Sequence, residues 1–372
     1  MAKPGMIDRM IGRRTFLTGI AGAGALALAG CGSDDKPAPP KAPTATTSTT
    51  PTTINPKVAS TVATGLNVPW GIAFLASGAA YVSQRDDGSL LRIDPDGTVT
   101  PLGGVDGADA ATSEGGLMGI ALDPDDESVL YAYMSTRSDD RLVRLAVTGD
   151  AVGKPEPLIT GVRSAANHHG GRLVFDDSGH LFLAIGDGAV PDDAQDKGSL
   201  NGTILRLDKE GKPASGNPFG NEVWSYGHRN VEGLAFDADG RLWASEFGQD
   251  AFDELNLIQK GGNYGWPQVE GTSDDPDFVT PKVTWHTDEC SPAGIAITRS
   301  TAFMAGLRGE CVWMIPLDGE SAGKPVRLFE GEYGRIRDVV VAPDESLWVS
   351  TSNTDSRGRP DDKDDRILRV TL

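Results

Sequence analysis

The chain has 372 residues, with 34 lysines and arginines against 53 aspartates and glutamates, and a net charge of −19. Such an excess of negative charge argues against nucleic acids and anionic membrane surfaces as partners. The 47 glycines and 24 prolines are too many for a helical bundle and favour short strands joined by turns, so we expect an all-β protein.

The first thirty residues have the pattern of an export signal. The motif RRTFL at 13–17 precedes an uncharged apolar run over 19–30, which is too short to span a bilayer. The first motif resembles a twin-arginine signal, and LAGC at 28–31 resembles a bacterial lipobox. We predict a signal peptide over 1–30 and a lipid-modified Cys31 that holds the protein at the outer face of the cell membrane. The alternative is an ordinary secretion signal with an incidental cysteine.

The segment that follows is rich in proline, threonine and alanine. Residues 31–56 hold almost no large apolar side chain, so they cannot bury enough surface to offset the entropy of ordering. We predict a disordered tether over 31–56 and a folded domain over 57–372.

One unit recurs six times after the tether: an apolar strand, a turn with Asp or Gly, a second strand and usually a third. The opening strands begin at Gly71, Gly119, Arg172, Gly233, Gly294 and Asp338. Successive openings lie 48, 53, 61, 61 and 44 residues apart, near the ~40–50 residues of a four-stranded propeller blade with variable loops. The spacing predicts a six-bladed β-propeller. The alternative is a two-domain β-sandwich, into which six like units do not divide naturally.

The last unit ends with its third strand, Arg366 to Leu372, and has no fourth. An unassigned strand over Val58–Leu66 precedes the first unit. Because a propeller ring must close to remove its open end, we predict that this N-terminal strand completes the last blade.

The densest group of polar residues is NHHGGR at 167–172, directly before an inner strand, followed by IGDG at 185–188. Loops before inner strands converge on the axial channel of a propeller. Asp187 ends the neighbouring strand, where its carboxylate could orient the imidazole of His168. A neutral histidine oriented in this way is a competent general base near pH 7. The alternative is a pair of turn histidines without a catalytic role.

Basic loops from several blades follow in the chain. They contain Arg229, Arg308, Arg335 and Arg337, in an otherwise acidic protein. If these loops face one channel, they form a pocket for a small polyanion. The alternative gives each arginine an acidic partner at the surface.

Two cysteines remain if Cys31 carries lipid. Cys290 and Cys311 are an even pair in an oxidising compartment, which predicts a disulfide between them. The alternative is two buried thiols, because sequence does not give their Cα separation.

Several motifs resemble those of one family when they are taken in order. NHHGGRL with IGD, then SYGHRN, DELNLIQKGGNYGWP, LRG and GRIRDV, resemble the soluble aldose sugar dehydrogenases that use pyrroloquinoline quinone (PQQ). The resemblance extends over residues 58–372. That family's fold is a six-bladed propeller, in agreement with the repeat count.

The resemblance implies roles for individual residues. His168 matches the base that takes the proton of the anomeric hydroxyl as hydride leaves C1, and Asp187 matches the group that orients it. Arg229 matches the residue that polarises the quinone carbonyl. The other implied cofactor contacts are Asn230 and three arginines suited to bidentate pairing with carboxylates, Arg308, Arg335 and Arg337.

The family also uses calcium. Gly248 and Gln249 match positions whose backbone carbonyls bind the ion beside the cofactor, and Glu254 and Tyr264 match ligands of a structural calcium. The resemblance places Glu114 and Asn167 against the sugar. Many relatives carry Gln at the position of Glu114, so a carboxylate there changes substrate preference or the titration of the pocket. The short loop over 285–292 favours an open pocket that accepts several aldoses.

The resemblance therefore implies an enzyme that oxidises aldoses at C1 to lactones, and the lipobox implies that it is lipid-anchored. We expect a monomer, because a single membrane tether needs no partner subunit. It would pass electrons to an external quinone, cytochrome or dye. One alternative is a calcium-dependent lactonase, which needs several side-chain carboxylates on the propeller axis. Another is a redox-inactive binding propeller at the cell surface.

Overall fold

The computed structural model describes residues 54–110 and 113–372. The predicted signal peptide, Cys31 and nearly all of the predicted tether lie outside the described residues. Within them the chain forms β-strands β1 to β26 and one short 3₁₀ helix, Pro191–Gln195, which confirms the predicted all-β class. No helix in the described ranges has the length and apolar character needed to cross a membrane.

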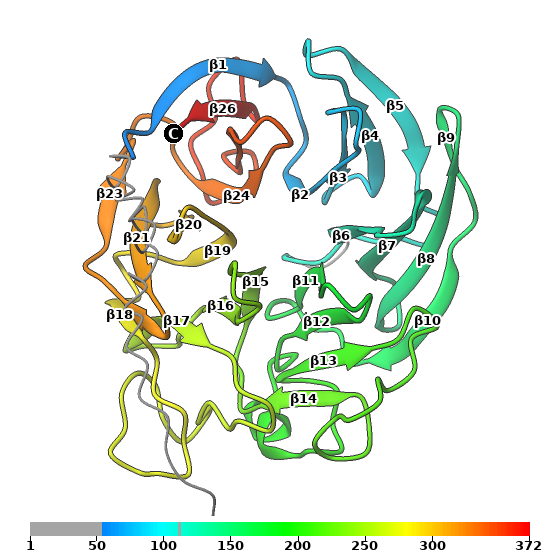
Figure 1. Cartoon of the computed structure of the whole chain (residues 1–372). Helices are drawn as coiled ribbons and strands as arrows, with labels where there is room; N and C mark the ends of the chain where they lie inside the picture. Colours follow the sequence, from blue (N-terminus) through cyan, green and yellow to red (C-terminus); the bar gives the residue numbers. More distant parts are fainter. Residues whose placement is uncertain (1–53, 111–112) are drawn as a thin grey trace, which may run out of the picture. The chain divides into compact units, whose positions relative to one another are not determined.

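Six antiparallel sheets stand around a central axis as the blades of a propeller (Figure 1). The first blade contains β2 (Pro69–Phe74), β3 (Ala80–Gln84), β4 (Ser89–Ile93) and β5 (Val99–Gly104). The second contains β6 (Leu117–Asp123), β7 (Asp126–Ser135), β8 (Asp140–Thr148) and β10 (Glu156–Val162), with β9 (Ala151–Val152) paired to β8. The third contains β11 (Gly170–Phe175), β12 (Leu181–Ile185), β13 (Thr203–Leu207) and β14 (Val223–Tyr226).

The other three blades follow in chain order. The fourth contains β15 (Val231–Phe236), β16 (Leu242–Glu246), β17 (Phe252–Leu257) and β18 (Val283–His286). The fifth contains β19 (Pro292–Thr298), β20 (Thr301–Gly306), β21 (Cys311–Asp318) and β23 (Val326–Leu328), with β22 (Ser321–Ala322) paired to β21. The sixth contains β24 (Ile336–Val341), β25 (Leu347–Thr351), β26 (Ile367–Thr371) and β1 (Lys57–Ala63). The six blades confirm the prediction made from the repeats.

The N-terminal strand completes the last blade. β1 pairs antiparallel with β26, from Lys57 opposite Thr371 to Ala63 opposite Ile367. Figure 1 shows the blue β1 lying along the red β26. This confirms the predicted closure, which joins the two ends of the folded domain and covers an edge that would otherwise be unpaired.

The apolar core is divided among the contacts between blades. The first strands of neighbouring blades touch one another around the whole ring, from β2 and β6 to β24 and β2. Six clusters of buried apolar side chains in the described residues lie between adjacent blades, and the cluster between the second and third blades also includes Trp70 of the first. Middle strands such as β12 and β20 are buried along their whole length, which explains their largely apolar sequences. Each blade is therefore stabilised by its two neighbours, at about 1.5–3 kcal/mol for each large apolar side chain buried.

This architecture determines where a site can form. In an antiparallel sheet, the first strand starts at the same end of the sheet at which the second strand finishes. In all six blades, these strand ends lie at the same end of the central axis. Loops at these points can therefore bring residues from six distant parts of the sequence together.

Candidate active site

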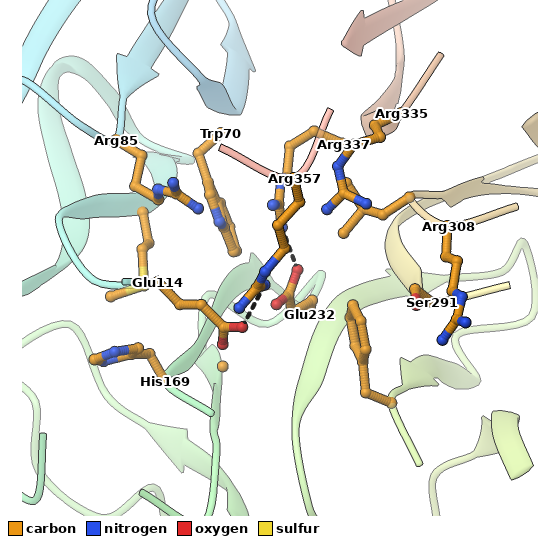
Figure 2. Close-up of a pocket in the computed structure, with 14 residues that line it drawn as sticks. Trp70, Arg85, Glu114, His169, Glu232, Ser291, Arg308, Arg335, Arg337 and Arg357 are labelled. Carbon is orange, nitrogen blue, oxygen red and sulfur yellow. Dashed lines mark hydrogen bonds and ion pairs between the residues drawn. The ribbon is translucent and has the colours of Figure 1, made fainter. Parts of the chain in front are cut away.

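A cavity of about 350 Å³ is lined by residues from all six blades (Figure 2). The residues come from the starts of first strands, the ends of second strands and the loops beside them. The lining consists of Trp70, Arg85, Glu114, Met118, His169, Gly170, Glu232, Phe247, Ser291, Leu307, Arg308, Arg335, Arg337 and Arg357. It therefore has five arginines against two glutamates, although the chain as a whole is strongly acidic.

Two of the predicted cofactor-binding arginines lie side by side on β24 and the loop before it. Arg335 donates to Asp355 Oδ2 from Nε and Nη2, at 3.1 and 3.0 Å, and Arg337 donates to Glu232 Oε2. Burial tends to raise the pKa of Asp355, but the charges of Arg335 and Arg337 hold that pKa below its usual value. Burial raises the pKa of Glu232, although the charge of Arg337 opposes the shift. The paired arginines are thus held in fixed positions by buried carboxylates.

The arginines still have binding capacity to spare. The buried Nε of Arg337 has no hydrogen-bond partner among the described residues. Arg308 is exposed, and no ion pair to its guanidinium is formed within the part of the chain that the structure describes. Unsatisfied cationic groups at a cavity are what a polyanionic ligand requires. The structure therefore brings Arg308, Arg335 and Arg337 to one site, as the sequence predicted.

The predicted base and its orienting carboxylate form a close pair. His168 Nδ1 lies 2.7 Å from Asp187 Oδ1, and Asp187 is fully buried while the His168 side chain is 12% exposed. Asp187 also accepts hydrogen bonds from Trp266 Nε1 and from the backbone N–H of Ala189, both at 2.8 Å. With Asp187 held on three sides, the imidazole has a fixed orientation. His168 itself does not line the cavity, but its neighbours His169 and Gly170 do.

The backbone around His168 is also constrained. His168 has a φ of +64°, in the left-handed region that costs a side-chain-bearing residue about 1–2 kcal/mol. Its N–H donates to Glu114 Oε2 at 3.1 Å, so the predicted sugar contact Glu114 holds the loop of the predicted base. Gly186 packs so closely that a Cβ there would lie 2.0 Å from His168 O. Asn167, also predicted as a sugar contact, is half-buried and does not line the cavity.

The adjacent histidine has a similar partner but a different setting. His169 Nδ1 lies 2.7 Å from Asp140 Oδ2 and 3.3 Å from Ser135 Oγ, and its side chain is 2% exposed. Asp140 begins β8 in the second blade, so this pair joins the second and third blades. The two neighbouring histidines therefore make the same kind of contact with different access to solvent.

Arg229 and Asn230 lie between the third and fourth blades. The Arg229 guanidinium donates to Gln249 Oε1 at 2.7 and 3.1 Å and lies over the Trp266 ring, 5.4 Å from its centre. Asn230 Oδ1 accepts from Gly170 N at 2.9 Å, and its Nδ2 donates to Glu232. Neither residue lines the cavity. Asn230 thus holds Gly170 and Glu232, two residues that do line the cavity.

The predicted calcium ligands fall into two places. In the described residues, no hydrogen bond is made to the carbonyls of Gly248 and Gln249, which leaves both oxygens available to a cation. Glu254 is buried, and burial together with the nearby charge of Glu246 raises its pKa to about 8. The Tyr264 hydroxyl is already used, because it donates to Leu257 O and accepts from Gln259 N. Backbone oxygens and a buried carboxylate suit a hard cation, although no cluster of three His, Cys, Asp or Glu side chains in the described ranges is arranged to bind one.

The predicted disulfide is absent. Cys290 and Cys311 are both free and buried, in the apolar cluster between the fourth and fifth blades. Burial raises the pKa of the Cys311 thiol to about 12, and it also raises the pKa of Cys290 well above its usual value. The prediction was wrong because an even number of cysteines does not determine how their side chains point. Here both serve as small apolar residues.

Sequence reasoning missed several residues of this site. Glu232 and Trp266 lie inside or beside motifs that were recognised, but their partners are 105 and 79 residues away in the sequence. Arg85 and Arg357 stand in loops without a motif, and no local signal marks them as part of a cavity. The repeat of strands along the sequence could have placed each loop at the correct end of the propeller. It could not have shown which side chains of the loop enter the cavity.

Comparisons with known proteins give the relatives of the chain. The profile of the family described as Glucose / Sorbosone dehydrogenase matches residues 66–360. The aldose sugar dehydrogenase YliI of Escherichia coli is 31% identical over 328 residues, which cover 78% of this chain and 88% of the relative. Quinoprotein glucose dehydrogenase B of Acinetobacter calcoaceticus is 32% identical, over 59% of this chain and 54% of the relative. The structure of the PQQ-bound aldose sugar dehydrogenase of Streptomyces coelicolor superimposes with a TM-score of 0.82 at 47% identity, covering 85% of this chain and 97% of that one.

Proposed function

The chain belongs to the glucose/sorbosone dehydrogenase family and is a sugar dehydrogenase, and we propose that it oxidises aldoses at C1 to lactones with PQQ and calcium. One observation carries the proposal: a cavity with surplus arginines lies beside the hydrogen-bonded pair of His168 and Asp187. The first feature suits an anionic cofactor, and the second suits removal of a proton from a sugar hydroxyl.

The cavity fits PQQ by its chemistry. PQQ is a planar aromatic compound with several carboxylates. Arg308, Arg335 and Arg337 would bind those carboxylates, because the Nε of Arg337 has no partner in the described residues and Arg308 forms no ion pair there. Trp70 and Phe247 give the cavity apolar surface for the ring system. When bound, PQQ supplies the acceptor for the hydride that leaves C1.

His168 would act as the base. Its Nδ1–H is directed at Asp187, so Nε2 carries the lone pair that can accept the proton of the anomeric hydroxyl. Asp187 would stabilise the imidazolium formed in this step, while Trp266 and Ala189 keep the carboxylate from turning away. Arg229 would supply a positive charge that polarises the reacting carbonyl of the cofactor.

Calcium would bind to the carbonyl oxygens of Gly248 and Gln249. The loop that carries them is held by Glu270, whose Oε2 accepts from four successive backbone N–H groups, those of residues 249–252. Because the N–H groups face Glu270, the peptide carbonyls are free for an ion. A second calcium would relieve the repulsion that the buried Glu254 experiences from Glu246.

The decisive experiment adds PQQ and Ca²⁺ to purified apoprotein and follows reduction of a redox dye with a panel of aldoses. We expect sugar-dependent dye reduction that needs PQQ and is lost in the presence of a calcium chelator. If no aldose gives a PQQ-dependent signal, the redox-inactive binding propeller becomes the better interpretation. Lactone hydrolysis that needs calcium but not PQQ would instead identify a lactonase.

We also propose that the enzyme is exported and lipid-anchored, and that it passes electrons to a quinone or cytochrome at the membrane. The support is the sequence of residues 13–31, with its paired arginines and lipobox. Replacing Cys31 with Ser should release the enzyme from the membrane fraction. If the Cys31→Ser protein stays membrane-bound, the anchor is not at this cysteine.

A further inference from the structure

An ion pair crosses the rim of the cavity. Arg357 Nη1 lies 2.7 Å from Glu114 Oε1, although the two residues are 243 positions apart in the sequence. Arg357 stands in the loop between β25 and β26 of the sixth blade, and Glu114 stands before β6 of the second. Both line the cavity, and Figure 2 shows the guanidinium of Arg357 reaching Glu114 across it. The pair therefore lies where a substrate would meet a bound cofactor.

The loop that carries Arg357 is connected to Arg335, one of the arginines that line the cavity. Asp355 Oδ1 accepts from the backbone N–H of Arg357 at 3.0 Å, while its Oδ2 binds Arg335. Asp365, which is fully buried, accepts from the backbone N–H of Asn353. One buried carboxylate thus joins the Arg357 loop to an arginine proposed to bind the cofactor.

Glu114 connects the same loop to the proposed base. Its Oε1 binds Arg357, and its Oε2 accepts from the backbone N–H of His168. Burial alone would raise the pKa of Glu114, but the hydrogen bond and charge of Arg357 hold it below its usual value. Glu114 is therefore an ionised acceptor placed between a guanidinium and the base.

Arg357 keeps donors that the protein does not use well. Its remaining side-chain contact is 3.5 Å, from Nη2 to Ser113 Oγ, which is too long for a good hydrogen bond. Its side chain is 52% exposed, against 19% for Glu114. A charged donor beside a charged acceptor matches the paired hydroxyls of a sugar.

We propose that Arg357 binds the sugar and, together with Glu114, sets a preference for neutral over acidic sugars. The inference rests on the proposed function. Free N–H groups of Arg357 donate to sugar oxygens away from C1, while Glu114 accepts from a neighbouring hydroxyl. Because Glu114 neutralises the guanidinium, a sugar carboxylate gains little from entering. Arg357 is thus a specificity residue, and His168 remains the base.

The test compares Arg357→Gln with Arg359→Gln, a matched variant that removes the same charge from the same loop. Arg359 is exposed and does not line the cavity. With PQQ and Ca²⁺ present, Arg357→Gln should raise KM for glucose about 10- to 100-fold, the range for losing a hydrogen bond to a charged group, with kcat changed by less than about 3-fold. Arg359→Gln should keep the wild-type KM. A wild-type KM in Arg357→Gln overturns the proposal, and so does a loss confined to kcat.

The preference is tested with Glu114→Gln. This variant leaves the Arg357 charge without its partner, so kcat/KM for glucuronate relative to glucose should rise about 10-fold. The rise should disappear in the double variant with Arg357→Gln. An unchanged ratio in Glu114→Gln overturns the proposed charge selection.

A binding measurement separates this inference from the proposed function. 1,5-Anhydroglucitol lacks the C1 hydroxyl and cannot be oxidised there, so its affinity can be measured by calorimetry or by saturation-transfer NMR without turnover. Arg357→Gln should weaken its binding by about the same factor as KM, and Arg359→Gln should not. If the wild type binds this probe through Arg357 but shows no PQQ-dependent dye reduction, the oxidation is wrong and the sugar site stands. If dye reduction is normal and Arg357→Gln does not change the affinity for the probe, only the present inference fails.

Discussion

Two regions of the site differ in how completely the protein satisfies their polar groups: the base side, His168 and Asp187 next to the cavity, and the arginine side, Arg308, Arg335 and Arg337 in its lining. On the base side, Asp187 has partners on both oxygens and His168 is oriented by it. On the arginine side, Arg337 has an unpaired buried Nε, and the Arg308 guanidinium has no ion pair within the described residues. A complete network is ready for proton transfer without rearrangement, whereas an incomplete cationic one needs an anionic ligand. The comparison supports the proposal that the first region performs proton transfer and that the second binds the cofactor.

The largest effect is expected on the base side. Replacing His168 with Ala should reduce turnover by about 10²- to 10⁴-fold, the scale for loss of a general base, while PQQ affinity stays near that of the wild type. Steady-state dye reduction and a PQQ titration measure the two quantities. His286→Ala, at an exposed position, is the control for the loss of an imidazole. Wild-type turnover in His168→Ala would move the role to His169 or remove it.

The opposite pattern is expected on the arginine side. Arg337→Ala should weaken PQQ binding by about 2–5 kcal/mol, because one carboxylate of the cofactor would lose its charged partner inside the cavity. Turnover should largely recover at saturating PQQ. Arg229→Ala should remain slow under the same conditions, because its charge is proposed to act on the reacting carbonyl. Unchanged PQQ affinity in Arg337→Ala would contradict the assignment of this side to cofactor binding.

A smaller change tests whether the hydrogen bonds that hold Asp187 contribute to turnover. Trp266→Phe keeps the aromatic ring under Arg229 and removes only the Nε1–H that binds Asp187. Loss of one hydrogen bond to a charged group is worth about 1.5–3 kcal/mol at most, and we expect about a 10-fold fall in kcat. PQQ affinity should not change. If kcat is unaffected, His168 and Ala189 alone are sufficient to hold Asp187.

The smallest effect is expected away from both sides. Because Cys290 and Cys311 are free, reductant should not shift the unfolding temperature, and both should be alkylated once the protein is unfolded without reductant. In the folded protein they should react slowly, since burial raises the pKa of both thiols. Mass spectrometry of the alkylated peptides measures this. Thiols that become reactive only after reduction would restore the predicted disulfide.

The sequence by itself determined the architecture. Six apolar units at a blade-like spacing and one unassigned N-terminal strand were enough to predict the ring and its closure by β1. These features are readable because each blade repeats the same local pattern, with buried middle strands and Asp- or Gly-containing turns. The order of the motifs also pointed to His168, Asp187 and the three cofactor arginines, which the structure places at or beside one cavity.

Tertiary structure alone decided which side chains meet. The contacts between Arg357 and Glu114, Glu232 and Arg337, and Trp266 and Asp187 join residues 79 to 243 positions apart. Local sequence patterns report propensity and burial, but not which loop of one blade faces which loop of another. The same limit explains the error at Cys290 and Cys311, because the number of thiols is readable from the sequence, whereas only the folded structure shows that both are free and packed in an apolar cluster. The repeats encode the propeller through local patterns. The site depends on how the variable loops of different blades meet in the closed ring.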